Sequence, residues 1–123
     1  MIKTKKMKQF SDLKFKDHAN VKDGVQARLK VGDFEVSVVS MKTASGTGFG
    51  GLYGDASSGT YEVAVFGDNG TMLPLTPYDD VKGWQSVNDL NDLLKDLQSD
   101  EVDNFIQGLT DKKDEHLKEM DLA

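Results

Sequence analysis

Hydrophobic and polar residues alternate in three stretches of the chain, at 25–31, 34–41 and 61–66. A period of two is typical of strands that place one face in a protein core and the other in water. Only Gly32 and Asp33 separate the first two stretches, a connection short enough for a tight hairpin. The pattern therefore predicts three strands, the first two of them antiparallel neighbours.

A fourth strand is predicted at 71–76, because the turn sequence Gly67-Asp-Asn-Gly70 precedes it and favours a chain reversal. Pro74 has no N–H to offer a neighbouring strand, which places this strand at the edge of the sheet. Trp84 follows in the segment that leaves the sheet, and we expect its large side chain to anchor that segment against the core.

The apolar period changes to a helical one after Ser86. Ser86 is a good N-cap, and Asp89 three residues later completes a capping-box pattern. Ser99 repeats the cap signal for a second helix, for which Gly108 is a plausible end. The apolar stripes consist of Val87, Leu90, Leu93, Leu94 and Leu97 in the first helix, and Val102, Phe105, Ile106 and Leu109 in the second.

These elements predict an α+β fold, a four-stranded antiparallel meander with one or two C-terminal helices packed on one face. A chain of 123 residues is enough for one such domain, expected at 10–109. Residues 1–9 are expected to form a flexible basic arm, and 110–123 a polar acidic tail or helix. Leu90 and Leu94 are expected to be buried against the valines of the strands.

Charge is distributed unevenly along the chain, whose net charge is −6. Residues 1–60 contain ten Lys or Arg against six acidic residues, whereas residues 61–123 contain five against fifteen. The acidic half is either a solvated surface or a docking surface for a partner, with Asp100, Glu101 and Asp103 as its candidate residues. A homodimer is one form of such association, and nucleic acid is expected to bind only through the lysines of the arm, from Lys3 to Lys8.

Several classes of protein are excluded by the composition. The sequence has no cysteine, so it has no disulfide framework and no thiolate chemistry. It has no apolar run long enough to cross a membrane, and its basic N-terminus lacks the apolar segment of a signal peptide. We therefore expect a cytoplasmic protein without cofactors.

The glycine-rich span 45–59 is the first candidate for a binding site, because a long loop inside a small domain is either functional or disordered. Gly46-Thr-Gly-Phe-Gly-Gly51 matches the dinucleotide-binding pattern, but glycines after it disfavour the helix that this pattern must open. The candidate residues of this loop for binding a small ligand or a partner are Phe49, Tyr53 and Asp55, with Asp79 at the rim.

No set of residues in the sequence indicates catalysis. His18 and His116 lack a second ligand at metal-binding spacing, and Ser57 and Ser58 lack the elbow motif of a serine nucleophile. The acidic pair that begins at Asp79 is more typical of a solvated loop than of an acid–base pair. We therefore expect a protein that is not an enzyme.

A series of short sequence motifs extends over residues 24–98. The motifs, in order, are Gly24-Val-Gln-Ala27, Ser37-Val-Val39, Gly51-Leu-Tyr53, Tyr61-Glu-Val-Ala-Val65 and Asp79-Asp-Val-Lys-Gly-Trp84, followed by the first predicted helix with its leucine stripe. Their order and spacing resemble those of a group of small uncharacterised bacteriophage proteins. The resemblance implies a phage-encoded protein acting in the cytoplasm of an infected bacterium, and it implies no catalytic or binding residue.

Three functions remain open after these observations. The first is a non-enzymatic accessory protein that binds a host or phage protein. The second is a protein that binds a small ligand or nucleotide through the span 45–59. The third is a minor component of the virion.

Overall fold

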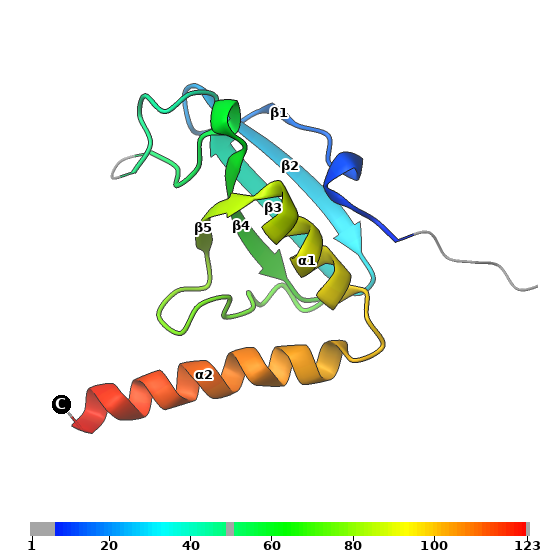
Figure 1. The fold of residues 1–123 in the computed structure, drawn as a ribbon, viewed down its shortest axis with the longest axis vertical. Coiled ribbons are helices and arrows are strands. Elements are labelled where there is room, and N and C mark those ends of the chain that lie inside the picture. The colour runs from blue at the N-terminus through cyan, green and yellow to red at the C-terminus, as the bar shows by residue number, and fades with distance from the viewer. Residues whose placement is uncertain (1–6, 49–50, 123) are drawn as a thin grey trace, which may run out of the picture.

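The computed structural model describes residues 7–48 and 51–122, which form a five-stranded antiparallel sheet and two helices (Figure 1). The strands lie side by side in chain order, from β1 to β5. The elements are η1 (Phe10–Asp12), β1 (Lys16–Asp17), β2 (Gly24–Val31), β3 (Phe34–Met41), η2 (Ala56–Ser58), β4 (Thr60–Phe66), β5 (Lys82–Ser86), α1 (Val87–Leu97) and α2 (Val102–Leu122). The predicted α+β class with an antiparallel sheet is confirmed.

The three alternating stretches form β2, β3 and β4, as predicted. Val31 pairs with Phe34 across the β2–β3 hairpin, where Gly32 takes the left-handed conformation that this two-residue turn requires. On β3, Val36 pairs with Val65 of β4 in the same antiparallel sense. One face of all three strands thus carries a continuous apolar surface.

The predicted fourth strand at 71–76 is wrong. Only Met72 forms an isolated bridge, to Phe66, and the N–H of Leu73 donates to the carbonyl of Val65 before the chain leaves the sheet. The strand that pairs with β4 is β5, Lys82–Ser86, and the two-residue β1 adds a fifth at the opposite edge. Pro74, which cannot donate to a ladder, lies in the connection rather than in a strand.

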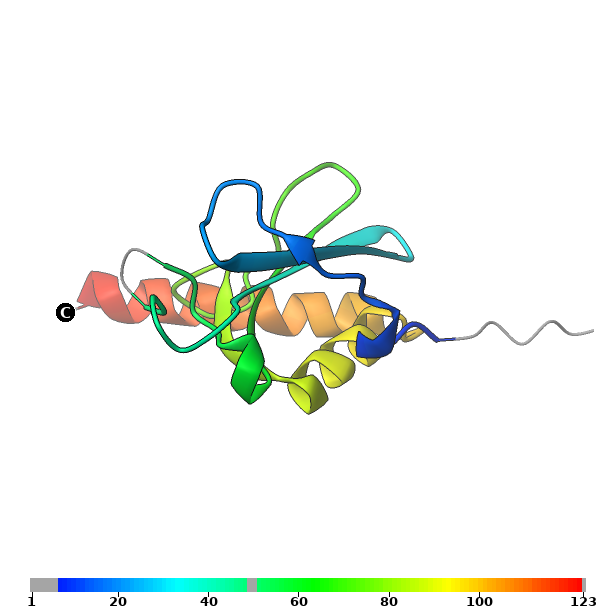
Figure 2. The ribbon, with the colours of Figure 1, turned by 90° about the horizontal axis from the view of Figure 1, so that it is seen from above.

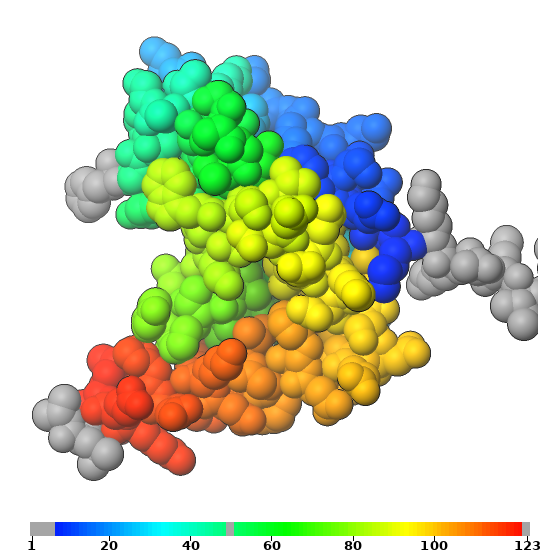
Figure 3. All heavy atoms as spheres, viewed as in Figure 1, coloured from blue at the N-terminus to red at the C-terminus, as the bar shows by residue number. Residues whose placement is uncertain are grey.

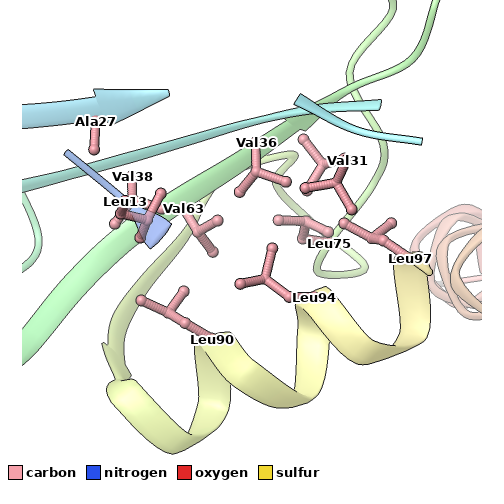
Figure 4. Packing of buried hydrophobic residues seen from close by; sticks show 11 residues of the cluster. Leu13, Ala27, Val31, Val36, Val38, Val63, Leu75, Leu90, Leu94 and Leu97 are labelled. Atoms are coloured by element: carbon pink, nitrogen blue, oxygen red, sulfur yellow. The ribbon is translucent and has the colours of Figure 1, made fainter. Parts of the chain in front are cut away.

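The core lies between the sheet and α1, which covers one side of the sheet (Figure 2). In Figure 4 the leucines of α1 point at the valines of the central strands. Val36, Val63, Leu90 and Leu94 are all buried, as predicted. The other buried members of this cluster are Leu13, Ala27, Val31, Val38, Val65, Leu75 and Leu97.

Both helices begin near the predicted caps, but the second is longer than expected. The Ser86 hydroxyl accepts from the N–H of Asp89, and the Asp89 carboxylate accepts from the N–H of Ser86, which is the predicted capping box. α2 continues through Gly108 to Leu122, so the predicted helix end at Gly108 is wrong. Residues 110–122, predicted as a tail or helix, are helical, and α2 runs across the lower end of the sheet in Figure 1.

The described part of the N-terminal arm is hydrogen-bonded to Gln98, at the end of α1. The N–H of Lys8 donates to the side-chain carbonyl of Gln98 at 2.8 Å, and the Gln98 amide donates back to the Lys8 carbonyl at 2.9 Å. Residues 1–6, the remainder of the predicted arm, lie outside the described residues. Among the helices that the structure describes, none is long and apolar enough to cross a membrane.

Candidate functional site

Trp84 is held in a backbone conformation that bulky residues rarely adopt. β5 pairs with β4 through Tyr61↔Gln85 and Val63↔Lys82, so two residues of β5 stand opposite Glu62 alone. This is a β-bulge, an irregularity that redirects a side chain and occurs often beside functional sites. Within it Trp84 has φ 55°, in the left-handed region that costs a residue with a Cβ about 1–2 kcal/mol.

Close packing of Tyr53 against the bulge fixes this conformation. The N–H of Trp84 donates to the carbonyl of Tyr53 at 2.8 Å. The two rings meet edge to face, with centroids 6.5 Å apart and an interplanar angle of 81°. A Cβ on Gly83 would lie only 2.6 Å from the Cβ of Tyr53, so only glycine permits this approach.

The bulge forms one wall of a cleft of about 570 Å³, which we call the aromatic cleft. Its lining residues are Tyr53, Glu62, Thr76, Tyr78, Asp79, Val81, Lys82, Gly83 and Trp84. The three aromatic residues remain accessible: Tyr53 is 44%, Trp84 50% and Tyr78 77% exposed. In Figure 3 a notch separates the yellow-green atoms of β5 from the green atoms of the segment 76–81.

Two carboxylates belong to the aromatic cleft. Burial raises the pKa of Glu62, and the nearby negative charge of Asp79 raises it further, while a hydrogen bond from the Tyr53 N–H (3.3 Å) and the charge of His18 lower it. The Asp79 carboxylate accepts from the N–H of Val81 at 3.1 Å, which fixes its position in the loop. The two acidic groups therefore lie close enough to interact, on a wall that also carries exposed aromatic rings.

A second hollow of about 460 Å³ adjoins the first along α2. The two hollows share Thr76, Tyr78 and Asp79, and the ring of Tyr78 meets that of His116 edge to face at 5.2 Å. Leu117 and Met120 of α2 complete its apolar lining. Among the described residues, the exposed large apolar side chains other than Met7 all line one of these two hollows.

Of the binding residues predicted from the sequence, Tyr53 and Asp79 line the aromatic cleft. Asp55 caps η2 instead: its carboxylate accepts from the N–H and hydroxyl of Ser57 and from the hydroxyl of Ser58, and these bonds lower its pKa. Phe49 lies outside the described residues. The cleft thus retains two of the predicted residues.

The predicted acidic group lies elsewhere, since Asp100, Glu101 and Asp103 are exposed at the beginning of α2. The sequence analysis missed the other seven residues that line the cleft, among them its second carboxylate, Glu62, and two of its aromatic residues, Tyr78 and Trp84. Trp84 was expected to anchor the chain against the core, and this is wrong, because half of its surface is exposed. A bulky residue directly after a glycine, outside any apolar pattern, is the signal that could have marked it.

The described residues show neither a long helix after the glycine pattern nor a metal-binding cluster. After the glycine pattern, residues 52–55 lead into the short turn η2 rather than into a long helix. The part of the chain that the structure describes has no group of three or more acidic or histidine side chains placed to hold a metal ion. The Nδ1 of His18 accepts from the N–H of Asn20.

Comparisons with known proteins do not identify a family for this chain. No family model, no curated protein and no solved structure matches the chain.

Proposed function

We propose that this protein acts by binding another protein, without catalysis of its own, and that the aromatic cleft is its contact site. The observation that carries the proposal is Trp84, a large apolar side chain held half-exposed by a strained bulge. Backbone strain persists only where the surrounding structure imposes it, and such outliers concentrate at functional sites.

The side chains around Trp84 are of the type that dominates protein interfaces. Tryptophan and tyrosine are enriched among interface residues that contribute most to binding, because they bury a large area at low cost in conformational entropy. Tyr53 and Tyr78 accompany Trp84, and the apolar residues of the second hollow extend the surface along α2. Contiguous exposed apolar surface of this kind marks interaction sites in small proteins.

A small-ligand binder is the second candidate, and one observation favours it. The cleft volume of about 570 Å³ lies within the range of about 300–1,000 Å³ that is usual for ligand pockets. Tyr53 and Asp79 would contact the ligand, as the sequence analysis expected. The aromatic residues of the cleft are 44–77% exposed, however, which suits a segment of a partner protein better than an enclosed molecule.

The resemblance to small phage proteins extends the proposal to a biological setting. The protein would be a phage-encoded accessory factor in the cytoplasm of an infected bacterium, with a host or phage protein as its partner. A second copy of the chain, which would make a homodimer, and the virion itself are the alternatives for that partner.

Affinity capture with matched variants tests the proposed function. The tagged protein, Trp84→Ala and Met7→Ala are used to capture proteins from a lysate of phage-infected cells. Met7 is the control because it is an exposed large apolar residue, 41% accessible, outside both hollows. The proposal expects a protein that wild type and Met7→Ala retain and Trp84→Ala loses.

Other outcomes of the same capture contradict the proposal. Equal recovery of the partner by all three proteins would show that the contact site lies outside the cleft. Recovery of assembled particles by wild type would favour the virion, and recovery of no protein, with a small molecule co-purifying, would favour the second candidate.

A further inference from the structure

We propose that the aromatic cleft recognises a lysine or arginine side chain presented by the partner protein. The inference rests on the proposed function, because it names the chemical group that the same cleft would take. It is carried by the combination of exposed aromatic faces and two carboxylates in one hollow.

The aromatic walls provide the first part of such a site. The rings of Tyr53 and Trp84 stand nearly perpendicular, at 81°, and both side chains are about half exposed in the cleft. A cation over a tryptophan or tyrosine face is attracted by the negative charge of the π-system, and tryptophan binds it best. The aliphatic stem of lysine or arginine can at the same time lie along the apolar ring surface.

The carboxylates provide the second part. Glu62 and Asp79 line the same hollow and repel each other, and burial adds to the cost of keeping Glu62 ionised. A bound cation would relieve both effects, because an opposite charge within a few ångströms favours ionised carboxylates. An apolar partner group would instead desolvate these two acids without bringing a positive charge into the cleft.

Lys82 also lines the cleft but does not satisfy these acids. Its partner across the sheet is Val63, whose side chain faces the core side, and its positive charge helps to lower the pKa of Asp89 in α1. The ion pairs present among the described residues are Arg28 with Glu35 and Lys42 with Asp17, both away from the cleft. Glu62 and Asp79 thus form no ion pair among the described residues; the charge of His18 lowers the pKa of Glu62, but His18 does not line the cleft.

The overall charge of the chain favours the same class of partner. A net charge of −6, with fifteen acidic residues after position 60, attracts basic protein surfaces and repels nucleic acid. A basic side chain in an extended segment of a partner protein could reach the cleft past the exposed Tyr78.

A direct binding experiment tests this inference with defined probes. Nα-acetyl-lysine N-methylamide is titrated into the 15N-labelled protein, and the neutral norleucine analogue serves as its apolar match. Trp84 is the only tryptophan in the chain, so its indole N–H gives one resolved reporter in the cleft. Saturable shifts are expected for the lysine analogue, with a dissociation constant of about 10 mM, and none of comparable size for norleucine.

Two variants separate charge recognition from general attraction. Glu62→Gln removes a carboxylate inside the cleft, and Asp103→Asn removes one outside it, so both change the net charge equally. We expect affinity for the lysine analogue to fall about threefold to tenfold in Glu62→Gln and to stay unchanged in Asp103→Asn. The fingerprint spectrum of each variant reports that it is folded.

The inference and the proposed function fail in different ways. Equal shifts with both analogues, no shift with lysine, or equal losses in the two variants would overturn the cation site. A partner captured through Trp84 would then still support the proposed function, whereas its capture by Trp84→Ala would overturn that function whatever the titration shows.

Discussion

The strained conformation of Trp84 predicts that glycine is more stable than alanine at this position, the reverse of the usual order in a strand. Glycine in a strand is normally less stable than alanine by about 0.5–1 kcal/mol, because glycine loses more backbone entropy on folding. At φ 55° alanine carries the steric cost of its Cβ, about 1–2 kcal/mol, and glycine does not. We therefore expect Trp84→Gly to be more stable than Trp84→Ala by about 0.5–1 kcal/mol.

The comparison isolates the backbone because both variants remove the same indole. The loss of its half-buried surface and of its contact with Tyr53 is common to the two and cancels in the difference. Lys82 in the same strand is the control position, since it is exposed and is not among the residues with positive φ. There, Lys82→Ala should be more stable than Lys82→Gly by the usual amount of about 0.5–1 kcal/mol.

Urea unfolding of the four variants at 25 °C measures these differences, with the free energy of unfolding obtained by linear extrapolation. The reasoning requires the order of glycine and alanine to reverse between the two positions. Alanine more stable than glycine at position 84, as at position 82, would refute the strain argument and remove the main support for a functional bulge.

Three further predictions concern the core and α2. Leu94→Ala should cost about 2–5 kcal/mol in urea unfolding, and a cost below about 0.5 kcal/mol would mean that α1 does not pack on the sheet. Gly108→Ala should stabilise α2 by about 0.5–1 kcal/mol, because a Cβ there meets no atom within 4 Å; a lower thermal midpoint would contradict it. Charge reversal at Asp100, Glu101 and Asp103 should lower the thermal midpoint slightly, since acids favour a helix N-terminus. Capture should be unchanged if the aromatic cleft is the contact, whereas loss of capture at low salt would favour the acidic docking surface.

The sequence predicted those elements whose local pattern and tertiary environment agree. β2, β3 and β4 each place one apolar face in the core that includes the leucines of α1, although the other face of β3 (Ser37, Val39 and Met41) is buried as well. Ser86 and Asp89 form the capping box by contacts three residues apart. Such elements need no information from distant parts of the chain.

The errors arise where distant contacts outweigh the local pattern. β5 contains Gly83 and Trp84 and lacks apolar alternation, yet it pairs with β4 through the bulge. The segment 71–76 follows a strong turn sequence and is more apolar than β5, but it leaves the sheet after Leu73. α2 continues through Gly108 because the cost of one glycine in a helix, about 1 kcal/mol, is small.

The candidate site was predictable only in part for the same reason. Tyr53 and Asp79 were identified from loop composition, but the cleft forms only when the chain brings them together with Glu62 of β4 and Trp84 of β5. The pairing of β4 with β5 has no signature in the local sequence, and the glycine before Trp84 marks the position without giving its backbone conformation.

The affinity of a captured partner for wild type and Trp84→Ala tests the central claim most directly. Isothermal titration with the purified partner should give a dissociation constant about thirtyfold weaker for Trp84→Ala, equivalent to about 2 kcal/mol, and unchanged for Met7→Ala. Equal affinity of wild type and a folded Trp84→Ala would contradict the claim that the aromatic cleft is the binding site.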